Sequence, residues 1–466
     1  MMLAFDFGGS NGRAVLGKYE NGSLSTELIN KFPIEPVTVG RRLYWNIYQI
    51  FQEIKNTLII CKKMGITLQS IGIDTWGNSF GLLDSDGDIL FYPLHYRDTL
   101  GPNCMDDAHS IVSKKEMFLK TGIIPQSWNA IYQLYGLYRI KPDIMRIAKR
   151  LLNTPDLLNY FLTGIAKNEL TILSSTQCFD VPNGCLATDV LVRLGIDPAL
   201  FGTLSPSGTI LGHLRPEFVQ EIGMDPVVIA VAGHDTPSAV AAVQKTNDFL
   251  FISCGTFSVI GVNIDTPYLT EDVFDREFTQ EISASGHIQL KKNITGLWIL
   301  QECKRIWQME GSVYTYDELD ELSEQARSKW VFDTTEPCFS IRCDMPSVIK
   351  KLCIELYGDA PQTPGEIFKT IEQSLAMTYA GIINDLETIT SRHYNEIYMV
   401  GGGIRHKQLC RMITERTQRT VIAGPAEATV LGNLKMQMVA MKLVDSLSVA
   451  NTISYKTEAP QIYQNQ

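Results

Sequence analysis

The sequence lacks the features that would place the protein in a membrane or on a nucleic acid. No apolar stretch approaches the roughly 18 residues of a membrane-spanning helix. The 466 residues carry a formal net charge of −10. The surplus of basic side chains that a phosphate backbone or an anionic lipid surface attracts is therefore missing. We expect neither a nucleic-acid partner nor a membrane partner.

Disulfide and zinc patterns are missing too. The ten cysteines are scattered, with no C-x-x-C pair and no His cluster at zinc-ligand spacing. Single cysteines of this kind are mostly small buried apolar residues. Reduced thiols fit a cytosol. The first residues reach an acid at Asp6 without a basic segment, unlike a signal peptide, so we expect a cytoplasmic protein.

Two familiar nucleotide-binding motifs are absent as well. The chain contains no G-x-x-x-x-G-K-[ST] P-loop, and its Gly-rich runs do not match G-x-G-x-x-G with an acidic residue at the dinucleotide spacing. What is present is the composition of an ordinary globular protein, 45% hydrophobic and 20% charged. Because 466 residues exceed the size at which one core stops growing, we expect two domains.

Two hairpin patterns lie about half a chain apart. Residues 3–17 (LAFDFGGSNGRAVLG) and 249–262 (FLFISCGTFSVIGV) each read as a β-rich run, a turn of Gly with Ser, Thr or Asn, and a second β-rich run. Such a recurrence indicates a duplicated architecture, although two similar hairpins also arise by chance. It predicts a boundary in the polar stretch 244–248, and hence domains 1–245 and 246–466.

Strand and helix patterns alternate along the rest of the chain, which indicates α/β sheets. A strand, a turn and a second strand are predicted over 70–83, and another strand over 396–400. Helices are predicted over 115–119, 130–139, 151–162, 296–308 and 364–386, with a further one beginning near 406.

The tripeptide His234-Asp235-Thr236 is the most informative short segment. It follows the apolar run 227–232 and Gly233, so the carboxylate lies at the carboxyl end of a strand, where α/β folds place their ligand sites. Asp235 is therefore a candidate general base.

The turns of the two hairpins are candidate phosphate sites. Gly8 to Gly12 form a Gly-rich turn after Asp6, whose amides can bind an anion while the carboxylate supports Mg2+ through water. A plain Gly-rich hairpin explains the same residues equally well. Gly255-Thr256 repeats the pattern with two amides and a hydroxyl. The run Gly401-Gly402-Gly403, between a strand and a helix, lets backbone approach a planar or phosphorylated group closely.

Two polar and aromatic clusters have two interpretations each. Trp76, beside Gly77, suits stacking on a sugar, yet a buried Trp is the commoner outcome. In Tyr96-Arg97-Asp98, the arginine either faces a sugar or pairs internally with the aspartate to hold a loop.

These motifs occur in the order typical of the FGGY carbohydrate kinases, and the chain resembles that family along nearly its whole length. The resemblance rests on IGIDTWG (71–77), YRD (96–98), HDTPSAV (234–240), SCGTFS (253–258) and KNITGLWILQ (292–301). It rests also on LTG (162–164), STQ (175–177), VGGG (400–403) and IAGPAEATVLGN (422–433). There are two departures from the family pattern: Asn78-Ser79-Phe80 stands where TWG is usually followed by Val-Asp-Phe, and His406 replaces a common Asn.

The resemblance implies an α/β, two-domain actin-like (ribonuclease H-like) fold, with mixed sheets flanked by helices and an interdomain cleft. It implies a sugar mainly on the first domain and ATP mainly on the second. Asp235 corresponds to the catalytic base. The substrate contacts implied or suggested by the motifs are Trp76, Gly77, Arg97, His234, Thr236 and Asn293. The expected ATP contacts are Gly9, Ser10, Asn11, Gly12, Arg13, Gly255, Thr256, Gln301, Gly402 and Gly403, with Asp6 for Mg2+.

The resemblance implies phosphorylation of the 1-hydroxyl of a 6-deoxy-ketohexose, with L-rhamnulose as the first expected substrate. L-Fuculose or another ketose or polyol is the alternative substrate, since Asn78-Ser79 leave the sugar open. An actin-like protein that uses ATP for conformational switching is the alternative from another class. The expected cofactors are ATP and Mg2+, and the protein is expected to be a monomer or a homodimer.

Overall fold

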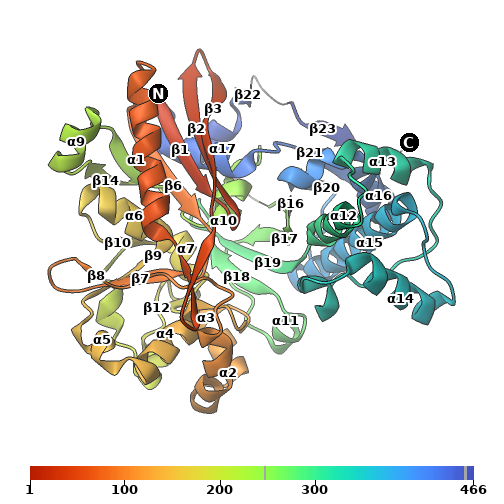
Figure 1. Cartoon of the computed structure of the whole chain (residues 1–466), viewed down its shortest axis with the longest axis horizontal. Helices are drawn as coiled ribbons and strands as arrows, with labels where there is room; N and C mark the ends of the chain where they lie inside the picture. Colours follow the sequence, from red (N-terminus) through yellow and green to blue (C-terminus); the bar gives the residue numbers. More distant parts are fainter. Residues whose placement is uncertain (246–247, 456–458, 466) are drawn as a thin grey trace. The chain divides into compact units, whose positions relative to one another are not determined.

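The computed structural model describes residues 1–245, 248–455 and 459–465 (Figure 1). The predicted boundary, 244–248, includes residues 246 and 247, which lie outside the described residues. Two compact units are present, each assembled from more than one segment. Unit 1 comprises 1–246, 263–290 and 428–457, and unit 2 comprises 247–262, 291–427 and 458–466. The division into domains 1–245 and 246–466 stays a prediction.

A mixed seven-stranded sheet forms the centre of unit 1. Its order is β14 (Thr209–His213), β15 (Val227–Ala230), β6 (Ser70–Thr75), β1 (Met2–Phe7), β2 (Asn11–Glu20), β3 (Ser23–Pro33) and β22 (Ser454–Tyr455). The predicted first hairpin is confirmed, because β1 and β2 pair antiparallel from Met2 with Gly17 to Phe7 with Gly12. β6 pairs parallel with β1 and with β15. Three parallel strands therefore end at one edge.

Alternation along β1 and β6 gives this sheet two different faces. Leu3, Phe5 and Phe7 join a core cluster with Ile71 and Ile73. The helices that contribute to this cluster include α1 (Ile47–Lys63) and α6 (Thr154–Thr163), and Ile222 of α9 (Pro216–Ile222) joins it as well. Smaller and polar residues occupy the alternate positions, and there α17 (Ala428–Ala440) contacts both strands.

α17 also packs closely on α10 (Asp235–Ala241). A Cβ at Gly432 would collide with the Ser238 carbonyl oxygen, so only glycine permits this approach.

Unit 1 carries further short elements around the sheet. Its other strands are β4 (Pro36–Val39), β5 (Arg42–Trp45), β7 (Phe80–Leu83), β8 (Ile89–Phe91), β9 (Arg150–Asn153), β10 (Lys167–Glu169), β11 (Phe179–Asp180), β12 (Cys185–Leu186) and β13 (Thr203–Ser205). Its other helices are α2 (Leu100–Ile111), α3 (Lys114–Thr121), α4 (Ala130–Ile140), α5 (Pro142–Ile147), α7 (Leu170–Ser174), α8 (Thr188–Arg193), α9 (Pro216–Ile222), α11 (Glu271–Asp275) and α18 (Leu447–Asn451).

The helix predicted over 151–162 is wrong at its start. Residues 150–153 form β9, which pairs antiparallel with β7. α6 begins only at Thr154, because Asn153 is extended and Pro155 suits the first turn of a helix.

The second seven-stranded sheet has the order β18 (Thr279–Ile282), β19 (Ile288–Thr295), β17 (Phe257–Ile264), β16 (Leu250–Cys254), β20 (Glu396–Val400), β21 (Thr420–Ala423) and β23 (Gln461–Tyr463). β16 pairs antiparallel with β17 and parallel with β20, and β20 pairs parallel with β21. The run β19-β17-β16-β20-β21 repeats the order of β3-β2-β1-β6-β15. The duplicated architecture indicated by the hairpins is confirmed.

The helices of unit 2 are α12 (Trp298–Met309), α13 (Tyr316–Gln325), α14 (Met345–Tyr357), α15 (Pro364–Thr390) and α16 (Lys407–Thr417). α15 starts with a capping box: Thr363 Oγ1 accepts from the Glu366 amide at 3.3 Å, and Glu366 Oε2 accepts from the Thr363 amide at 3.0 Å. This explains why the predicted start at Pro364 is correct.

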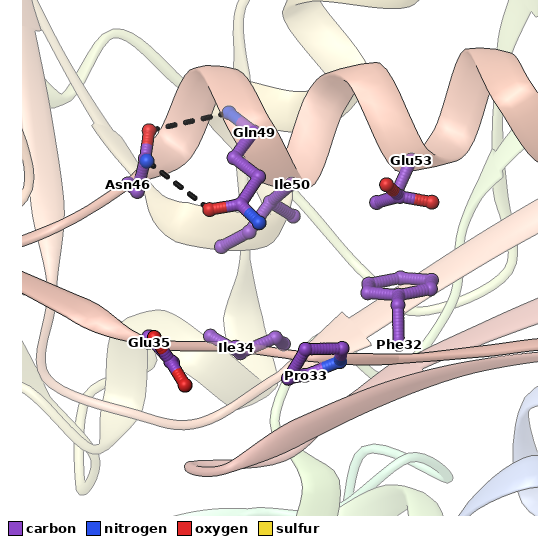
Figure 2. Close-up of a pocket in the computed structure, with 8 residues that line it drawn as sticks. All are labelled: Phe32, Pro33, Ile34, Glu35, Asn46, Gln49, Ile50 and Glu53. Atoms are coloured by element: carbon purple, nitrogen blue, oxygen red, sulfur yellow. Dashed lines mark hydrogen bonds between the residues drawn. The ribbon is translucent and has the colours of Figure 1, made fainter.

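A hollow between α1 and the β3–β4 segment is lined by Phe32, Pro33, Ile34, Glu35, Asn46, Gln49, Ile50 and Glu53 (Figure 2). Asn46 caps α1 there, and its Oδ1 accepts from the Gln49 amide at 3.3 Å. None of the predicted site residues lines this hollow. All ten cysteines are free, and no described helix is long and apolar enough to cross a membrane.

Candidate functional site

Three aspartates gather where three adjacent parallel strands of unit 1 end. Asp6 lies on β1 directly beside Asp74 on β6, and Asp235 is the first residue of α10, just beyond β15. The Thr75 amide donates to the Gly233 carbonyl at 2.9 Å. This bond holds the chain leading to Asp235 against the end of β6. The carboxyl edge of the sheet is where α/β folds place ligands.

A buried polar network connects this edge to α17. Asn433 Nδ2 donates to Asp74 Oδ2 at 2.6 Å, and Gln437 Nε2 donates to Asn433 Oδ1 at 2.8 Å. Gln437 Oε1 in turn accepts from Ser70 Oγ at 2.7 Å. The alternation of β6 turns Ser70 and Asp74 toward α17 while its isoleucines enter the core. Asp74 is therefore fully buried, and one of its carboxylate oxygens is held by the hydrogen bond from Asn433.

The carboxylates of Asp6 and Asp74 have different surroundings. Arg13 donates from Nε and Nη2 to Asp6 Oδ2 at 2.8 and 2.6 Å. Burial, followed by the nearby Asp6 charge, raises the pKa of Asp74 well above its ordinary value, and its Oδ1 has no hydrogen-bond partner among the described residues. An unpartnered carboxylate oxygen beside a second carboxylate fits Mg2+, which prefers oxygen ligands and keeps several waters.

His234 lies between two carboxylates. Its Nδ1 lies 3.1 Å from Glu281 Oε2, and its Nε2 lies 3.4 Å from Asp235 Oδ1. Thr236 Oγ1 donates to the same Asp235 oxygen at 3.3 Å. A Cβ on Gly77 would lie 3.2 Å from His234 Nε2. The structure thus brings Gly77, His234, Asp235 and Thr236 together, and their role at a sugar stays a prediction.

The backbone before Asp235 is held by a buried glutamate. Glu169 Oε2 accepts from the Gly233 amide at 3.1 Å and from Thr171 Oγ1 at 2.6 Å, while Oε1 accepts from Ser207 Oγ at 2.5 Å. Thr171 Oγ1 accepts from the His234 amide at 3.3 Å. Two consecutive amides are therefore fixed from the start of α7, which orients the Asp235 carboxylate.

Trp76 is buried rather than open to solvent. Its ring stacks on Trp45, with centroids 3.7 Å apart, and Trp45 Nε1 donates to Ser79 Oγ at 3.1 Å. One ring face of Trp76 is therefore covered by protein, while its indole N–H has no hydrogen-bond partner among the described residues. A sugar contact by Trp76 stays a prediction.

Tyr96, rather than its neighbour Arg97, is the member of the 96–98 triplet that faces the aspartate edge. A Cβ on Gly9 would lie 2.9 Å from Tyr96 Oη. Burial raises the pKa of Tyr96; Arg97 opposes the increase and the Asp235 carboxylate adds to it. Arg97 is exposed, and its amide donates to His95 Nδ1 at 3.0 Å. Asp98 pairs instead with Arg42 at 3.0 Å, so the proposed internal Arg97–Asp98 pair gains no support.

The turn between β1 and β2 offers free amides. The Gly8 amide donates to the Asn11 carbonyl at 2.9 Å, which closes the turn. The exposed amides of Gly9 and Ser10 make no backbone hydrogen bond within the described chain. At position 12 packing requires glycine instead, because a Cβ there would collide with the rings of Phe7 and Phe32. Gly9 and Ser10 are thus the amides available to an anion.

The corresponding turn of unit 2 is built in the same way. The Gly255 amide donates to the Phe257 carbonyl at 3.0 Å, and two amides at the start of α12 donate to the carbonyls of Gly255 and Thr256 at 2.9 and 3.1 Å. Thr256 Oγ1 and the Gln301 side-chain amide lie 3.3 Å apart. Thr256 is exposed, and its hydroxyl lies beside the Gln301 side chain.

The triple glycine follows β20, next to that turn in the parallel sheet. Gly401 has φ +87°, and a Cβ there would lie 2.8 Å from the Cys254 carbonyl. Gly403 is buried, and a Cβ would collide with Cys254 Sγ. Gly402 is exposed and open, since nothing lies within 4 Å of a Cβ built on it. Gly401 and Gly403 therefore permit packing, and Gly402 is the one open to a ligand.

Asn293 is exposed on β19 and belongs to unit 2, whereas the aspartate edge belongs to unit 1. A contact between Asn293 and a sugar stays a prediction. His406, at the start of α16, is buried, with 5% of its surface exposed.

Comparison with known proteins identifies the family. Residues 1–242 match the N-terminal domain of the FGGY family of carbohydrate kinases, and residues 250–441 match the C-terminal domain of the same family. The chain belongs to the FGGY family of carbohydrate kinases. It is therefore an ATP-dependent phosphotransferase that acts on a carbohydrate, and a purely switching, actin-like role is no longer needed to explain the fold.

Two relatives that match nearly the whole chain carry one name. The chain is 36% identical over 453 residues to a rhamnulokinase of Halalkalibacterium halodurans, covering 97% of this chain and 96% of that protein. It is 35% identical over 451 residues to a rhamnulokinase of Oceanobacillus iheyensis, covering 97% and 95%. A ligand-bound xylulose kinase of Lactobacillus acidophilus shares the fold, with a TM-score of 0.81 at 14% identity, covering 100% of this chain and 94% of the other.

Several residues of this FGGY site were not predicted from sequence. Glu169 and Glu281 are single acids far from Asp235 along the chain, and no local pattern distinguishes them. Asn433 lies within the motif IAGPAEATVLGN, and nothing in that motif indicates a partner for its side chain. Asp74 offered a usable signal, since in IGIDT it occupies the polar phase of an alternating strand that ends beside Gly77.

Proposed function

We propose that this FGGY kinase transfers the γ-phosphoryl group of ATP to the 1-hydroxyl of a 6-deoxy-ketohexose, L-rhamnulose, in the cytoplasm. The observation that carries the proposal is the half-exposed Asp235 carboxylate, held beside His234 at the end of three parallel strands. The near full-length similarity to two rhamnulokinases supports the choice of sugar.

The chemistry assigned to Asp235 is general-base catalysis. Its carboxylate accepts the proton of the sugar hydroxyl while that oxygen attacks the γ-phosphorus and ADP leaves. His234, placed by Glu281, orients the carboxylate and offers a hydrogen bond to the sugar. Glu169 fixes the backbone on which both stand. Most of the rate then comes from positioning and electrostatics, as phosphoryl transfer requires.

The phosphate contacts come from backbone and short polar side chains. The amides of Gly9 and Ser10 in one turn, and of Thr256 in the other, suit anionic oxygens. Gln301 and Gly402 are the further nucleotide contacts. Asp6 and Asp74 would hold Mg2+ through water, and the ion would neutralise charge on the phosphates.

The glycine run provides a test of the nucleotide contacts. Gly402→Val enters open space, so the thermal unfolding midpoint should not change while ATP affinity falls about tenfold, ~1.4 kcal/mol. Gly403→Val, one residue away, should cost about 1–3 kcal/mol of stability because it meets Cys254. Thermal unfolding and nucleotide titration of both variants measure these effects. Unchanged ATP affinity in Gly402→Val would exclude Gly402 from the nucleotide site.

The deciding experiment for the sugar is ADP release by the purified protein with Mg-ATP and, in parallel, L-rhamnulose, L-fuculose, D-xylulose or glycerol. L-Rhamnulose should give the highest kcat/KM. A preference for L-fuculose would overturn the sugar while leaving Asp235 in place. No stimulation by any of the four would overturn the 6-deoxy-ketohexose class.

L-Fuculose remains a second candidate because of Asn78-Ser79. In the structure both side chains are engaged within unit 1: Asn78 Oδ1 accepts from the Ala130 amide at 3.1 Å, and Ser79 Oγ donates to the Leu94 carbonyl at 2.9 Å. Ser79 is buried and joined to Trp45, which stacks on Trp76. Ser79 therefore stands where the family usually has an aspartate, and this difference acts on the candidate sugar site through the Trp45–Trp76 pair.

A further inference from the structure

A second cluster of possible metal ligands lies in unit 2, apart from the residues assigned to sugar and nucleotide. Asp320 on α13, Glu372 on α15 and His406 at the start of α16 each present a ligand atom within 4.8 Å of the other two. His406 Nδ1 already lies 3.0 Å from Asp320 Oδ1. An edge-on contact with Tyr316 and a tilted contact with Phe368 hold the imidazole ring in place.

Glu372 is the member of the cluster whose carboxylate has an unsatisfied oxygen. It is completely buried, and Ser323 Oγ donates to its Oε2 at 2.6 Å. Its Oε1 has no hydrogen-bond partner among the described residues. A buried carboxylate oxygen without a partner is costly. Among the described residues, no Lys or Arg forms an ion pair with Glu372 or Asp320; the charge of Lys369 is near enough only to oppose the increase in the pKa of Glu372 that burial causes.

We propose that Asp320, Glu372 and His406 bind one divalent transition-metal ion of the Zn2+ type. Imidazole nitrogen and carboxylate oxygen are ligands that zinc accepts, at about 2.0–2.2 Å. Two ligands of a tetrahedral ion then lie about 3.3 Å apart, close to the present separation of His406 Nδ1 and Asp320 Oδ1. The Asp320 side chain is 21% exposed, which leaves a side open for water as the fourth ligand.

The ion would join three helices at one point. α13, α15 and α16 each contribute one ligand, and His406 directly follows the Gly402–Arg405 turn. A bound ion compensates the two carboxylates and provides the missing partner of Glu372 Oε1. Because it binds only the folded unit, Zn2+ should raise the unfolding temperature, and the rise should continue with the logarithm of the free Zn2+ concentration above saturation.

The test is equilibrium dialysis of the chelator-treated full chain against ZnCl2, with bound metal measured by elemental analysis. One Zn2+ per chain is expected, and Glu372→Gln and His406→Asn should each lower binding at least tenfold. His393→Asn is the matched control, because it removes an exposed His that pairs with Glu387 at 3.0 Å in the same unit. This control should bind zinc like the wild type.

Co2+ provides a readout that needs no variant. Four-coordinate Co2+ with nitrogen and oxygen ligands should give visible bands that saturate at one equivalent in the wild-type protein. A thiolate charge-transfer band would place the ion on cysteines and overturn the proposal. Absence of stoichiometric zinc, or equal binding by wild type and His406→Asn, would overturn it as well.

Discussion

Asp235→Asn should lower the turnover of sugar-dependent ADP release by about 10²- to 10⁴-fold while leaving ATP affinity nearly unchanged. The amide keeps the shape and the first position of α10 but cannot accept the proton of the attacking hydroxyl. The Asp235 side chain is 40% exposed, so the substitution should have little effect on the free energy of unfolding. The measurements are kcat at saturating sugar and ATP, and ATP binding by titration.

Asp225→Asn is the matched control for this loss. Asp225 also pairs with a histidine, His213, at 3.1 Å in unit 1, and both side chains are exposed. The control should keep wild-type turnover. Near-normal turnover in Asp235→Asn would remove Asp235 from the role of general base.

Glu169→Gln should have the second large effect, on stability and turnover together. The buried carboxylate accepts hydrogen bonds from the amides of Gly233, Thr171 and Ile172 and from two hydroxyls. An amide turns one acceptor oxygen into a donor, so buried donors lose their partner at a cost of about 3 kcal/mol. Turnover should fall because the Gly233–His234 backbone no longer fixes Asp235. Denaturant unfolding and kcat report the two effects.

Glu318→Gln is the control that distinguishes the positioning role of Glu169 from ordinary helix capping. Glu318 also accepts from a backbone amide at a helix start, Thr315 at 2.7 Å, but it is exposed. It should lose about 0.5–1 kcal/mol and no activity. If Glu169→Gln behaved like this control, its proposed positioning role would be wrong.

Much of the fold was predictable because the evidence was local. The two hairpins follow from β-rich runs interrupted by Gly turns, and both formed where predicted. α15 begins at Pro364 because the capping box of Thr363 and Glu366 lies within four residues. The helix predicted to start at residue 151 was wrong for the opposite reason, because its evidence was not local. Leu151 and Leu152 lie in β9, which pairs with the distant strand β7.

The candidate site likewise contains residues that local patterns predict and residues that only long-range contacts bring in. Asp235, Gly9 and Thr256 stand at strand ends and turns that sequence patterns locate. Glu281 reaches His234 across 47 positions, and Asn433 reaches Asp74 across 359. A hydrogen bond over such a separation depends on how strands and helices pack, and no local pattern contains that information.

By itself the sequence determined the strand–turn–strand units, the α/β class and the place of Asp235 at a strand end, because hydrophobic period, turn residues and charge act over a few neighbours. Only the tertiary structure decided which glycines serve packing and which are open. It also decided that Glu169 holds the backbone of Asp235, and that Asp320, Glu372 and His406 meet. Those outcomes depend on which distant surfaces are buried against one another, and burial gives an unpartnered oxygen or an added Cβ its energetic cost.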